Sequence, residues 1–367
     1  MSVSYSVLVV ILVAIIAVIG IVQLLKEKSD NDISNVMLQT GVALLLSGIP
    51  SIAELMIALV AVLFSKEIPE TGNTYVFMAV GFILILLSLI VRVKLKERIY
   101  VLNMLGIRKK EISSDKAKQD LKIADYKLKE QVLDIIPVFN NGTEMDEKAN
   151  SYIVKQVQDD VEKFAVKSKE NGGCFTGMAP IPYTVFAGTF LGEADVNRYF
   201  EFNRNAGETY YELKKKRIFQ RRKWKDLEII NCEKAENVAE VVLAISITHN
   251  VMDADLSQFA GMNVVRVGLS APKDNVIEFQ EQLMEYKRVI HDCLDIKLRE
   301  WFPNLKTVNL IASIPSCMSI EIGKIIGMGT NRMMDIIVYH YIHSNPIKYP
   351  FGIYVSGSRK GTFVKVE

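Results

Sequence analysis

Cysteine, histidine and the common catalytic signatures are scarce or absent in this chain of 367 residues. Its four cysteines include no CxxC pair, and its four histidines are not spaced as metal ligands. There is no GxxxxGK(S/T) phosphate loop, no HExxH metal motif, no GxSxG elbow and no GxGxxG after an expected strand. We therefore expect no metal, no cofactor and no enzymatic activity, and the free cysteines indicate a reducing compartment.

An excess of one charge is also lacking, since 44 basic residues face 42 acidic ones and the net charge is +2. Domains that bind nucleic-acid polymers usually carry a strongly basic surface. We therefore expect no DNA or RNA polymer as a partner, although local groups can still hold a small anion.

Long apolar runs are abundant in the first hundred residues. Those at 5–25, 41–64 and 75–93 are long enough to cross a hydrocarbon core of ~30 Å, although two spans rather than three stay open. The first has no basic residue before it and no small-residue cleavage site after it, so we interpret it as a retained span. Basic residues cluster after the third run and place 97–367 in the cytoplasm by the positive-inside rule (Arg92, Lys94, Lys96, Arg98, Arg108, Lys109 and Lys110).

Two residues stand out in the second run. Pro50 removes a backbone donor and predicts a kink, and Glu54 places an ionisable group inside an apolar segment. Glu54 either lines a pore or protomer contact, or lies near a kinked helix end where local water solvates it. The sequence leaves both interpretations open.

The composition divides the chain into three parts: a transmembrane module at 1–96, a helical connector at 97–148 and an α/β domain at 149–367. In the connector, Ile112–Leu133 has apolar residues at roughly helical spacing and predicts an amphipathic helix. Ser114 or Ser113 is its expected N-cap. A second helix is expected at Ala149–Ser168, with Ile153, Val157, Val161 and Phe164 on one stripe.

An approximate internal repeat organises the α/β domain. Gly177–Gly192 (GMAPIPYTVFAGTFLG) predicts a strand end, a proline turn and a helix, and Val308–Gly327 (VNLIASIPSCMSIEIGKIIG) predicts the same order again. The copies match at Ala179 and Ala312, and at Pro182 and Pro315. Each helix carries a glycine pair (Gly188/Gly192 and Gly323/Gly327), which we expect to allow close packing on the sheet.

Each half continues into further strands, so continuous Val/Ile runs alternate with helices. This pattern indicates a mainly parallel sheet covered on both faces. Ligands of such sheets bind at the carboxyl ends of strands, near helix N-termini, where backbone amides favour a phosphate. We therefore expect a two-part ligand site at the proline turns (Pro180, Pro182, Tyr183 and Thr184 in the first; Ser313, Pro315, Ser316 and Ser319 in the second).

Other candidate ligand contacts lie outside the two turns. Thr248 ends the expected buried strand Glu240–Thr248 and His249 follows it, so both reach the same end of the sheet. The basic segment around Trp224 suits stacking of a base, and Arg204 suits a phosphate contact. The alternative is a solvated basic face with its aromatic residues in the core.

At these residues the chain resembles the SAVED domain. The resemblance covers roughly Ala149–Val364 and rests on APIP before a helix, on the strand AISIT, and on IASIPSCMSIEIGKIIG. SAVED domains are similar to two fused CARF-like, Rossmann-like units, which agrees with the repeat.

The resemblance implies the function. A cytoplasmic sensor would bind a cyclic di- or trinucleotide made by a CD-NTase in a CBASS antiphage system, and binding would drive homo-oligomerisation. The membrane module would then disrupt the lipid bilayer of the bacterial inner membrane and cause cell death or growth arrest. Two alternatives stay open: a membrane-anchored enzyme that degrades cyclic oligonucleotides, and a membrane receptor that signals through a partner protein.

Overall fold

The computed structural model of the chain describes residues 39–41, 81–90, 98–124, 126–142, 145–203, 207–216, 221–222, 224–230, 234–328 and 334–366. The chain forms two compact units, Met1–Arg98 and Ile99–Glu367. In the first unit, residues 81–90 are helical. Most of the apolar side chains of this helix are exposed by 41% to 53% (Phe82, Ile83, Leu86, Leu87, Leu89 and Ile90).

The predicted membrane spans fall almost wholly outside the described residues, and so do Pro50 and Glu54. Of the three spans, only Gly41 and 81–90 are described. Within the described part of the chain, no helix is both long enough and apolar enough to cross a bilayer. The three spans therefore stay predictions.

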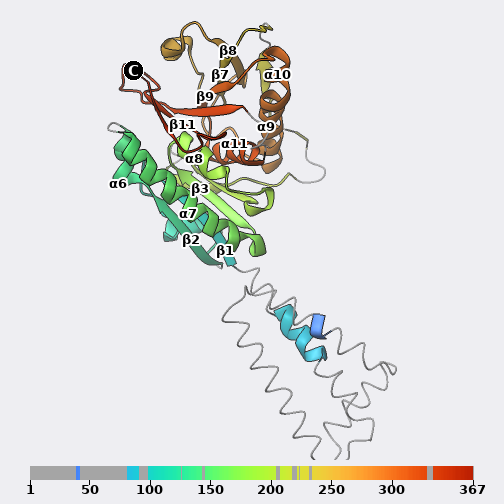
Figure 1. Ribbon diagram of the computed structural model, residues 1–367. Coiled ribbons are helices and arrows are strands. Elements are labelled where there is room, and N and C mark those ends of the chain that lie inside the picture. Colours follow the sequence, from blue (N-terminus) through green and yellow to red (C-terminus); the bar gives the residue numbers. More distant parts are fainter. Residues whose placement is uncertain are drawn as a thin grey trace, which may run out of the picture. The chain divides into compact units, whose positions relative to one another are not determined.

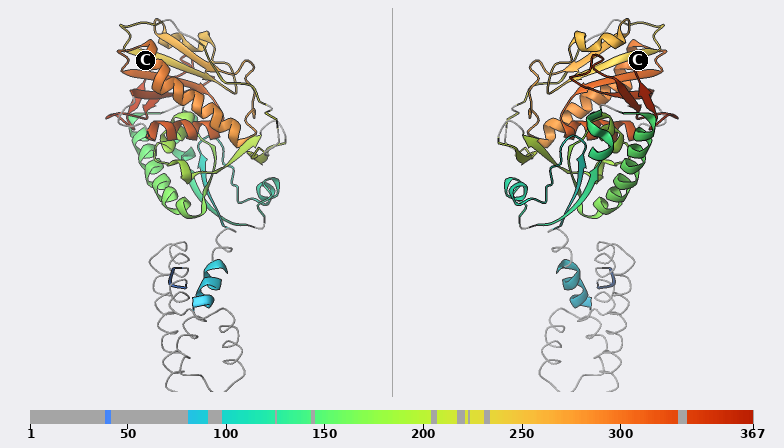
Figure 2. Two further views of the ribbon diagram at one scale, coloured as in Figure 1. Left: turned by 90° about the vertical axis from the view of Figure 1, so that its right-hand side faces the viewer. Right: turned by 90° about the vertical axis from the view of Figure 1, so that its left-hand side faces the viewer.

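The second unit contains two β-sheets (Figures 1 and 2). The first has the order β2-β1-β3-β4-β5, with strands β1 (Arg98–Leu105), β2 (Lys127–Asp134), β3 (Gly173–Met178), β4 (Arg198–Asn203) and β5 (Thr209–Glu212). The second has the order β12-β11-β10-β9-β7-β8-β6, with strands β6 (Glu228–Ile230), β7 (Glu240–Ser246), β8 (Asn263–Gly268), β9 (Thr307–Ser313), β10 (Asp335–His340), β11 (Phe351–Tyr354) and β12 (Phe363–Lys365).

Each sheet has a parallel centre, as the Val/Ile runs predicted. β1, β3 and β4 pair in parallel, and so do β10, β9, β7 and β8. Antiparallel strands complete the edges, with β5 on β4, β6 on β8, and β11 and β12 beyond β10. The mixed α/β fold class is confirmed, with two sheets in place of one.

The helices of the second unit connect and cover these sheets. They are α5 (Asp115–Asp120), α6 (Ile136–Phe139), α7 (Glu147–Asn171), α8 (Ile181–Gly188), α9 (Gln280–Asp292), α10 (Leu298–Trp301) and α11 (Ser316–Met328). Short turns of 3-10 helix are η1 (Asn140–Gly142), η2 (Glu193–Asp195) and η3 (Asp253–Phe259), and the π-helical turn η4 (Cys293–Lys297) joins α9 to α10.

Helix α7 confirms the predicted second helix. The Asp146 side chain caps its start by accepting a hydrogen bond from the Ala149 amide at 2.7 Å. Gly172 ends it with φ of 73°, a conformation that side-chain-bearing residues rarely adopt. The predicted stripe of Ile153, Val157, Val161 and Phe164 is fully buried in the main core.

The predicted connector helix at Ile112–Leu133 is wrong. Only α5 is helical, and the Ser114 hydroxyl caps it as expected, accepting a hydrogen bond from the Ala117 amide. The segment then becomes β2 at the edge of the first sheet, next to β1. Only Leu128, Val132 and Leu133 of KLKEQVLD are apolar, so neither a helical nor a strand period is marked here. The segment forms a strand where it completes the edge of the first sheet.

Both copies of the repeat adopt the predicted strand, turn and helix. β3 leads into α8 in the first half, and β9 leads into α11 in the second. Each helix also reaches the other half, since α8 contacts β10 and β11 while α11 contacts β3 and β4. Helices α8 and α11 therefore lie together between the two sheets (Figure 1).

Glycines allow these two helices to cross at backbone contact. A Cβ atom on Gly323 would lie 2.1 Å from the Val185 carbonyl oxygen and 2.6 Å from Gly188 Cα. One on Gly327 would lie 2.5 Å from the Thr189 carbonyl oxygen. The glycines thus serve helix–helix packing rather than packing on the sheet, and Gly192 lies beyond the end of α8.

His340 lies in a cage of aromatic rings. Its ring centroid is 5.2 Å from that of Phe139 and 5.2 Å from that of Phe351. Burial lowers the pKa of His340 to about 4 from its ordinary value of 6.5. His343 is exposed and contacts Tyr341, so the two histidines do not form a pair.

The helix crossing predicts that Gly188→Ala destabilises the chain. The added Cβ would lie 2.2 Å from the Ile320 carbonyl oxygen, so α8 and α11 must separate. We expect a loss of about 1–3 kcal/mol in the free energy of unfolding, measured by denaturant titration. Gly192→Ala is the matched control, because its nearest neighbour would lie at an ordinary 3.4 Å. Equal stability of both variants would contradict this account of the crossing.

The aromatic cage predicts a pH-dependent stability. The unfolded state binds a proton near pH 6.5 and the folded state near pH 4, so the contribution of neutral His340 is present above pH 6.5 and is lost as the pH falls toward 4. Compared with His340→Phe, the wild-type chain should lose about 3 kcal/mol of unfolding free energy between pH 7 and pH 4. Parallel stability curves for the two proteins would contradict it.

Candidate functional site

A cleft of about 310 Å³ lies where the two halves of the second unit meet. Its lining comes from the carboxyl ends of parallel strands, from the turns before α8 and α11, and from a loop before α9. The lining residues are Ile107, Gly177, Met178, Ala179, Ile181, Glu201, Phe202, Thr248, His249, Asp274, Asn275, Ile314, Pro315, Ser316 and Ser319. Both proline turns therefore contribute to one cleft, as the repeat suggested.

The loop after β7 is tied to the end of β9. The amides of Ile247 and Thr248 both donate to the Ser313 carbonyl oxygen at 2.9 Å. The Ser313 hydroxyl accepts from the His249 amide at 3.2 Å and pairs with the Thr248 hydroxyl at 2.8 Å. Ser313 thus holds Thr248 and His249 at the cleft and does not itself line it.

The His249 side chain lies at the rim of the cleft. It is 70% exposed, and its Nδ1 is 3.9 Å from Asp274 Oδ1. Exposure leaves the imidazole accessible to an incoming ligand.

Glu201 is the residue that the sequence analysis missed. It comes from β4 in the first half, yet its Oε1 accepts the Cys317 amide at 2.6 Å and the Ser316 hydroxyl at 3.0 Å, both in α11. The side chain is only 7% exposed. The carboxylate therefore occupies part of the α11 N-terminus that we had assigned to a ligand phosphate.

Burial raises the pKa of Glu201, while hydrogen bonds from Cys317 and Ser316 oppose that shift. The thiol pKa of Cys317 is also raised, first by burial and then by Glu201. The Cys317 thiol is therefore not an activated nucleophile.

Several predicted contacts lie in the interior instead of the cleft. Tyr183 is fully buried and donates its hydroxyl to Asn150 Oδ1 at 3.2 Å. The Thr184 hydroxyl donates to the Pro180 carbonyl oxygen at 3.2 Å, and Pro180 and Pro182 are buried. The helix begins at Ile181, so these side chains turn into the core and only Ala179 and Ile181 of this turn line the cleft.

Ser319 makes the same hydrogen bond in the second half as Thr184 makes in the first, but Ser319 also lines the cleft. Its hydroxyl donates to the Pro315 carbonyl oxygen at 3.1 Å, as Thr184 does to Pro180. Ser316, Ser319 and Pro315 all line the cleft.

Trp224 lies away from the cleft. Its ring packs on Phe279 at 5.5 Å, and its Nε1 donates to Glu285 at 2.9 Å. Lys216 and Arg222 lie over the ring at 5.9 Å and 5.7 Å. The prediction that Trp224 stacks a base is therefore not supported by its position. Arg204 lies outside the described residues.

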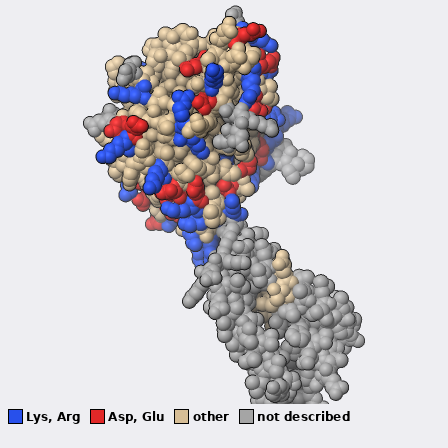
Figure 3. Space-filling view, in the orientation of Figure 1, with Lys and Arg blue, Asp and Glu red and all other residues tan. Residues whose placement is uncertain are grey.

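A second hollow, of about 430 Å³, shares Phe202 with the cleft and is lined by charged residues (Lys109, Lys110, Lys116, Glu111, Asp120 and Glu208). Lys110 Nζ pairs with Glu208 at 2.8 Å. Figure 3 shows acidic and basic side chains interspersed over the visible face of the second unit. That distribution agrees with the balanced charge of the chain.

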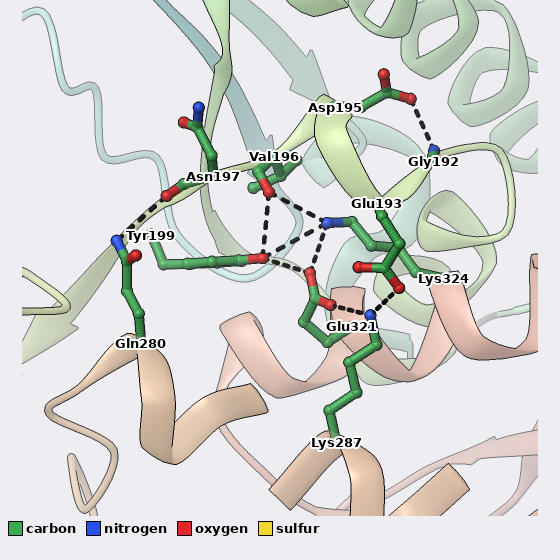
Figure 4. A network of polar contacts seen from close by, with 10 residues as sticks. All are labelled: Gly192, Glu193, Asp195, Val196, Asn197, Tyr199, Gln280, Lys287, Glu321 and Lys324. Carbon is green, nitrogen blue, oxygen red and sulfur yellow. Dashed lines mark hydrogen bonds and ion pairs between the residues drawn. The ribbon is translucent and has the colours of Figure 1, made fainter. Parts of the chain in front are cut away.

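Behind the cleft, a buried polar network joins α11 to the first half and to α9 (Figure 4). Glu321 pairs with Lys324 at 2.6 Å and with Lys287 at 2.8 Å, and it accepts the hydroxyl of Tyr199. Glu321 and Lys324 are fully buried. Lys287 also pairs with Glu193, next to α8.

The network keeps its charges in spite of burial. Burial by itself would raise the pKa of Glu321, but the ammonium groups of Lys324 and Lys287 outweigh it and lower the pKa. Burial would lower the pKa of Lys287, but Glu321 and Glu193 raise it. Tyr199 and Glu201 are two residues apart on β4, so one strand contacts α11 at two points.

A model of a known family matches most of the second unit. The model of the family described as "SMODS-associated and fused to various effectors sensor domain" (SAVED) matches residues 156–355, more than half of the chain. No curated protein matches this chain.

Solved structures also match. One is the Acinetobacter baumannii Cap4 SAVED/CARF-domain containing receptor with the cyclic trinucleotide 2'3'3'-cAAA, at 14% identity and a TM-score of 0.46 over 81% of this chain and 58% of that one. The Moraxella osloensis Cap4 SAVED/CARF-domain containing receptor matches at 12% identity and a TM-score of 0.41 over 69% and 48%. This chain thus spans about half the length of the receptors it matches.

The buried network predicts an asymmetric stability effect. Lys324→Met leaves the carboxylate of Glu321 buried with one cation fewer, and we expect a loss of about 3–5 kcal/mol in unfolding free energy. Adding Glu321→Met removes the unpaired charge and should recover much of that loss. Denaturant titration of the two variants measures both steps, and a double variant no more stable than the single one would contradict the charge-pair account.

Proposed function

Because the chain belongs to the SAVED family of sensor domains, we propose that its second unit is a receptor for a cyclic oligonucleotide made during antiphage defence. The observation that carries this proposal is the single cleft formed by both proline turns. A ligand built from repeated nucleotides suits a site built from two related halves. The cleft also lies at the carboxyl ends of parallel strands, where such folds bind nucleotides.

The proposal extends to the membrane. Residues 1–96 would form spans at about 5–25, 41–64 and 75–93, with the second unit in the cytoplasm of a bacterium. The exposed apolar side chains of residues 81–90 support this, because a contiguous exposed apolar surface is typical of contact with lipid or with another protein. Ligand-induced assembly of several chains would then reorganise these spans and permeabilise the inner membrane.

Two other functions predict different results. A membrane-anchored enzyme would consume the cyclic oligonucleotide, and a receptor acting through a partner protein would bind it without disturbing lipid. His249 and Thr248 are the residues that an enzyme would have to use, and the Thr248 hydroxyl is already hydrogen-bonded to that of Ser313.

The test uses the full chain in liposomes loaded with a fluorescent dye, together with a panel of cyclic di- and trinucleotides. We expect one ligand to bind and to release dye, with the ligand recovered intact. Ligand turnover without leakage would favour the enzyme, and binding with neither would favour the partner-dependent receptor.

Filling the cleft tests where the ligand binds. Ser316→Trp places an indole in the cleft and should lower affinity at least tenfold, as measured by calorimetry with the ligand found above. Ser151→Trp is the control, because Ser151 is exposed on α7. Melting temperatures check that both variants fold, and unchanged affinity in a folded Ser316→Trp chain would move the site elsewhere.

A further inference from the structure

We propose that the floor of the cleft receives the edge of a nucleobase rather than a phosphate, and that Glu201 selects bases that carry an amino group. This inference rests on the proposed function. It names the base edge as the part of the ligand that the cleft recognises.

The charges of the cleft argue against a phosphate at its floor. Glu201 and Asp274 are the acidic residues of its lining, and the described lining contains no lysine or arginine. Glu201 is 7% exposed, whereas the side chains of Asp274 and His249 at the rim are 48% and 70% exposed. A phosphate at the floor would therefore meet a carboxylate with little water to screen the repulsion.

Glu201 is held ready to accept hydrogen bonds from a ligand. A carboxylate has about four acceptor positions, and α11 uses three of them, through the Cys317 amide, the Cys317 thiol and the Ser316 hydroxyl. These bonds fix the orientation of the carboxyl group before any ligand arrives. The remaining position suits an N–H donor, and an exocyclic amino group is the donor that bases present to Glu or Asp.

The internal repeat shows that the fold itself does not require a carboxylate here. Tyr199 pairs with Phe175, so Glu201 lies two residues further along beside Gly177. Gly177 corresponds to Leu310 in the second copy, and Leu310 pairs with Val338. Val338 is buried and apolar, and the facing helix α8 begins with no side-chain cap. One half of the repeat thus has the carboxylate of Glu201 at a position where the other half has the buried side chain of Val338.

The neighbouring hollow, which shares Phe202 with the cleft, is lined by three lysines and three acidic residues (Lys109, Lys110, Lys116, Glu111, Asp120 and Glu208). A phosphate that reached this hollow would compete with Glu208 for Lys110. A base inserted beside Glu201 leaves its sugar and phosphate toward the rim of the cleft.

The test compares cyclic trinucleotides with and without the exocyclic amino group. The probes are all-adenosine and all-purine-riboside rings, and all-cytidine and all-2-pyrimidinone-riboside rings, with the same linkages within each pair. For the full-length wild-type chain, we expect the better-binding amino ring to bind at least tenfold more tightly than its counterpart without the amino group. The variant Glu201→Gln can also donate, so its preference should fall to threefold or less or reverse. Glu240→Gln, on the exposed start of β7, should keep the wild-type preference.

The outcomes separate the two proposals. Binding of a ring by the wild type without an amino preference would overturn the role of Glu201 and leave the receptor function standing. A folded Glu201→Gln chain that keeps the full preference would do the same. If the wild type binds none of the four rings nor any cyclic dinucleotide, the receptor function itself is wrong.

Discussion

The close crossing of α8 and α11 is the contact on which the second unit depends. Gly188 and Gly323 bring the two backbones together, and each helix then packs on the sheet of the other half. Because each helix follows its proline turn directly, this contact also brings both turns to one cleft. A side chain at either glycine would separate the halves, so the packing of the core and the geometry of the site have the same cause.

The contact of β4 with α11 is polar, and the corresponding contact of β10 with α8 is apolar. β4 contacts α11 through Tyr199 and Glu201, whereas the corresponding part of β10 presents Ile336 and Val338. Buried charges such as Glu321 and Lys324 are costly to desolvate and gain little net stability over apolar residues. Polar groups that occur in only one of the two repeat copies therefore suit a role that the copies do not share, such as a ligand contact made by one copy.

Local patterns in the sequence predicted much of this fold. The repeat, the parallel strands and the stripe on α7 depend on neighbours along the chain, so each was visible in the residues themselves. Glu201 was not, because its role depends on β4 meeting α11 more than a hundred residues later. Tyr183 and Thr184 were placed at the site because they follow a proline turn, but the start of α8 directs them into the core. The strand at β2 was missed because KLKEQVLD has no clear period of its own and forms a strand only beside β1.

Hydrogen–deuterium exchange of the full chain, with and without a saturating cyclic trinucleotide that it binds, tests the central claim most directly. The account predicts new protection at both turns and at the loop after β7, in residues 177–181, 247–250 and 314–319, from one ligand. Protection at only one of the two turns would contradict a site shared by both halves. Protection confined to the separate hollow beside β6 and β8, around Arg266, would place the ligand elsewhere.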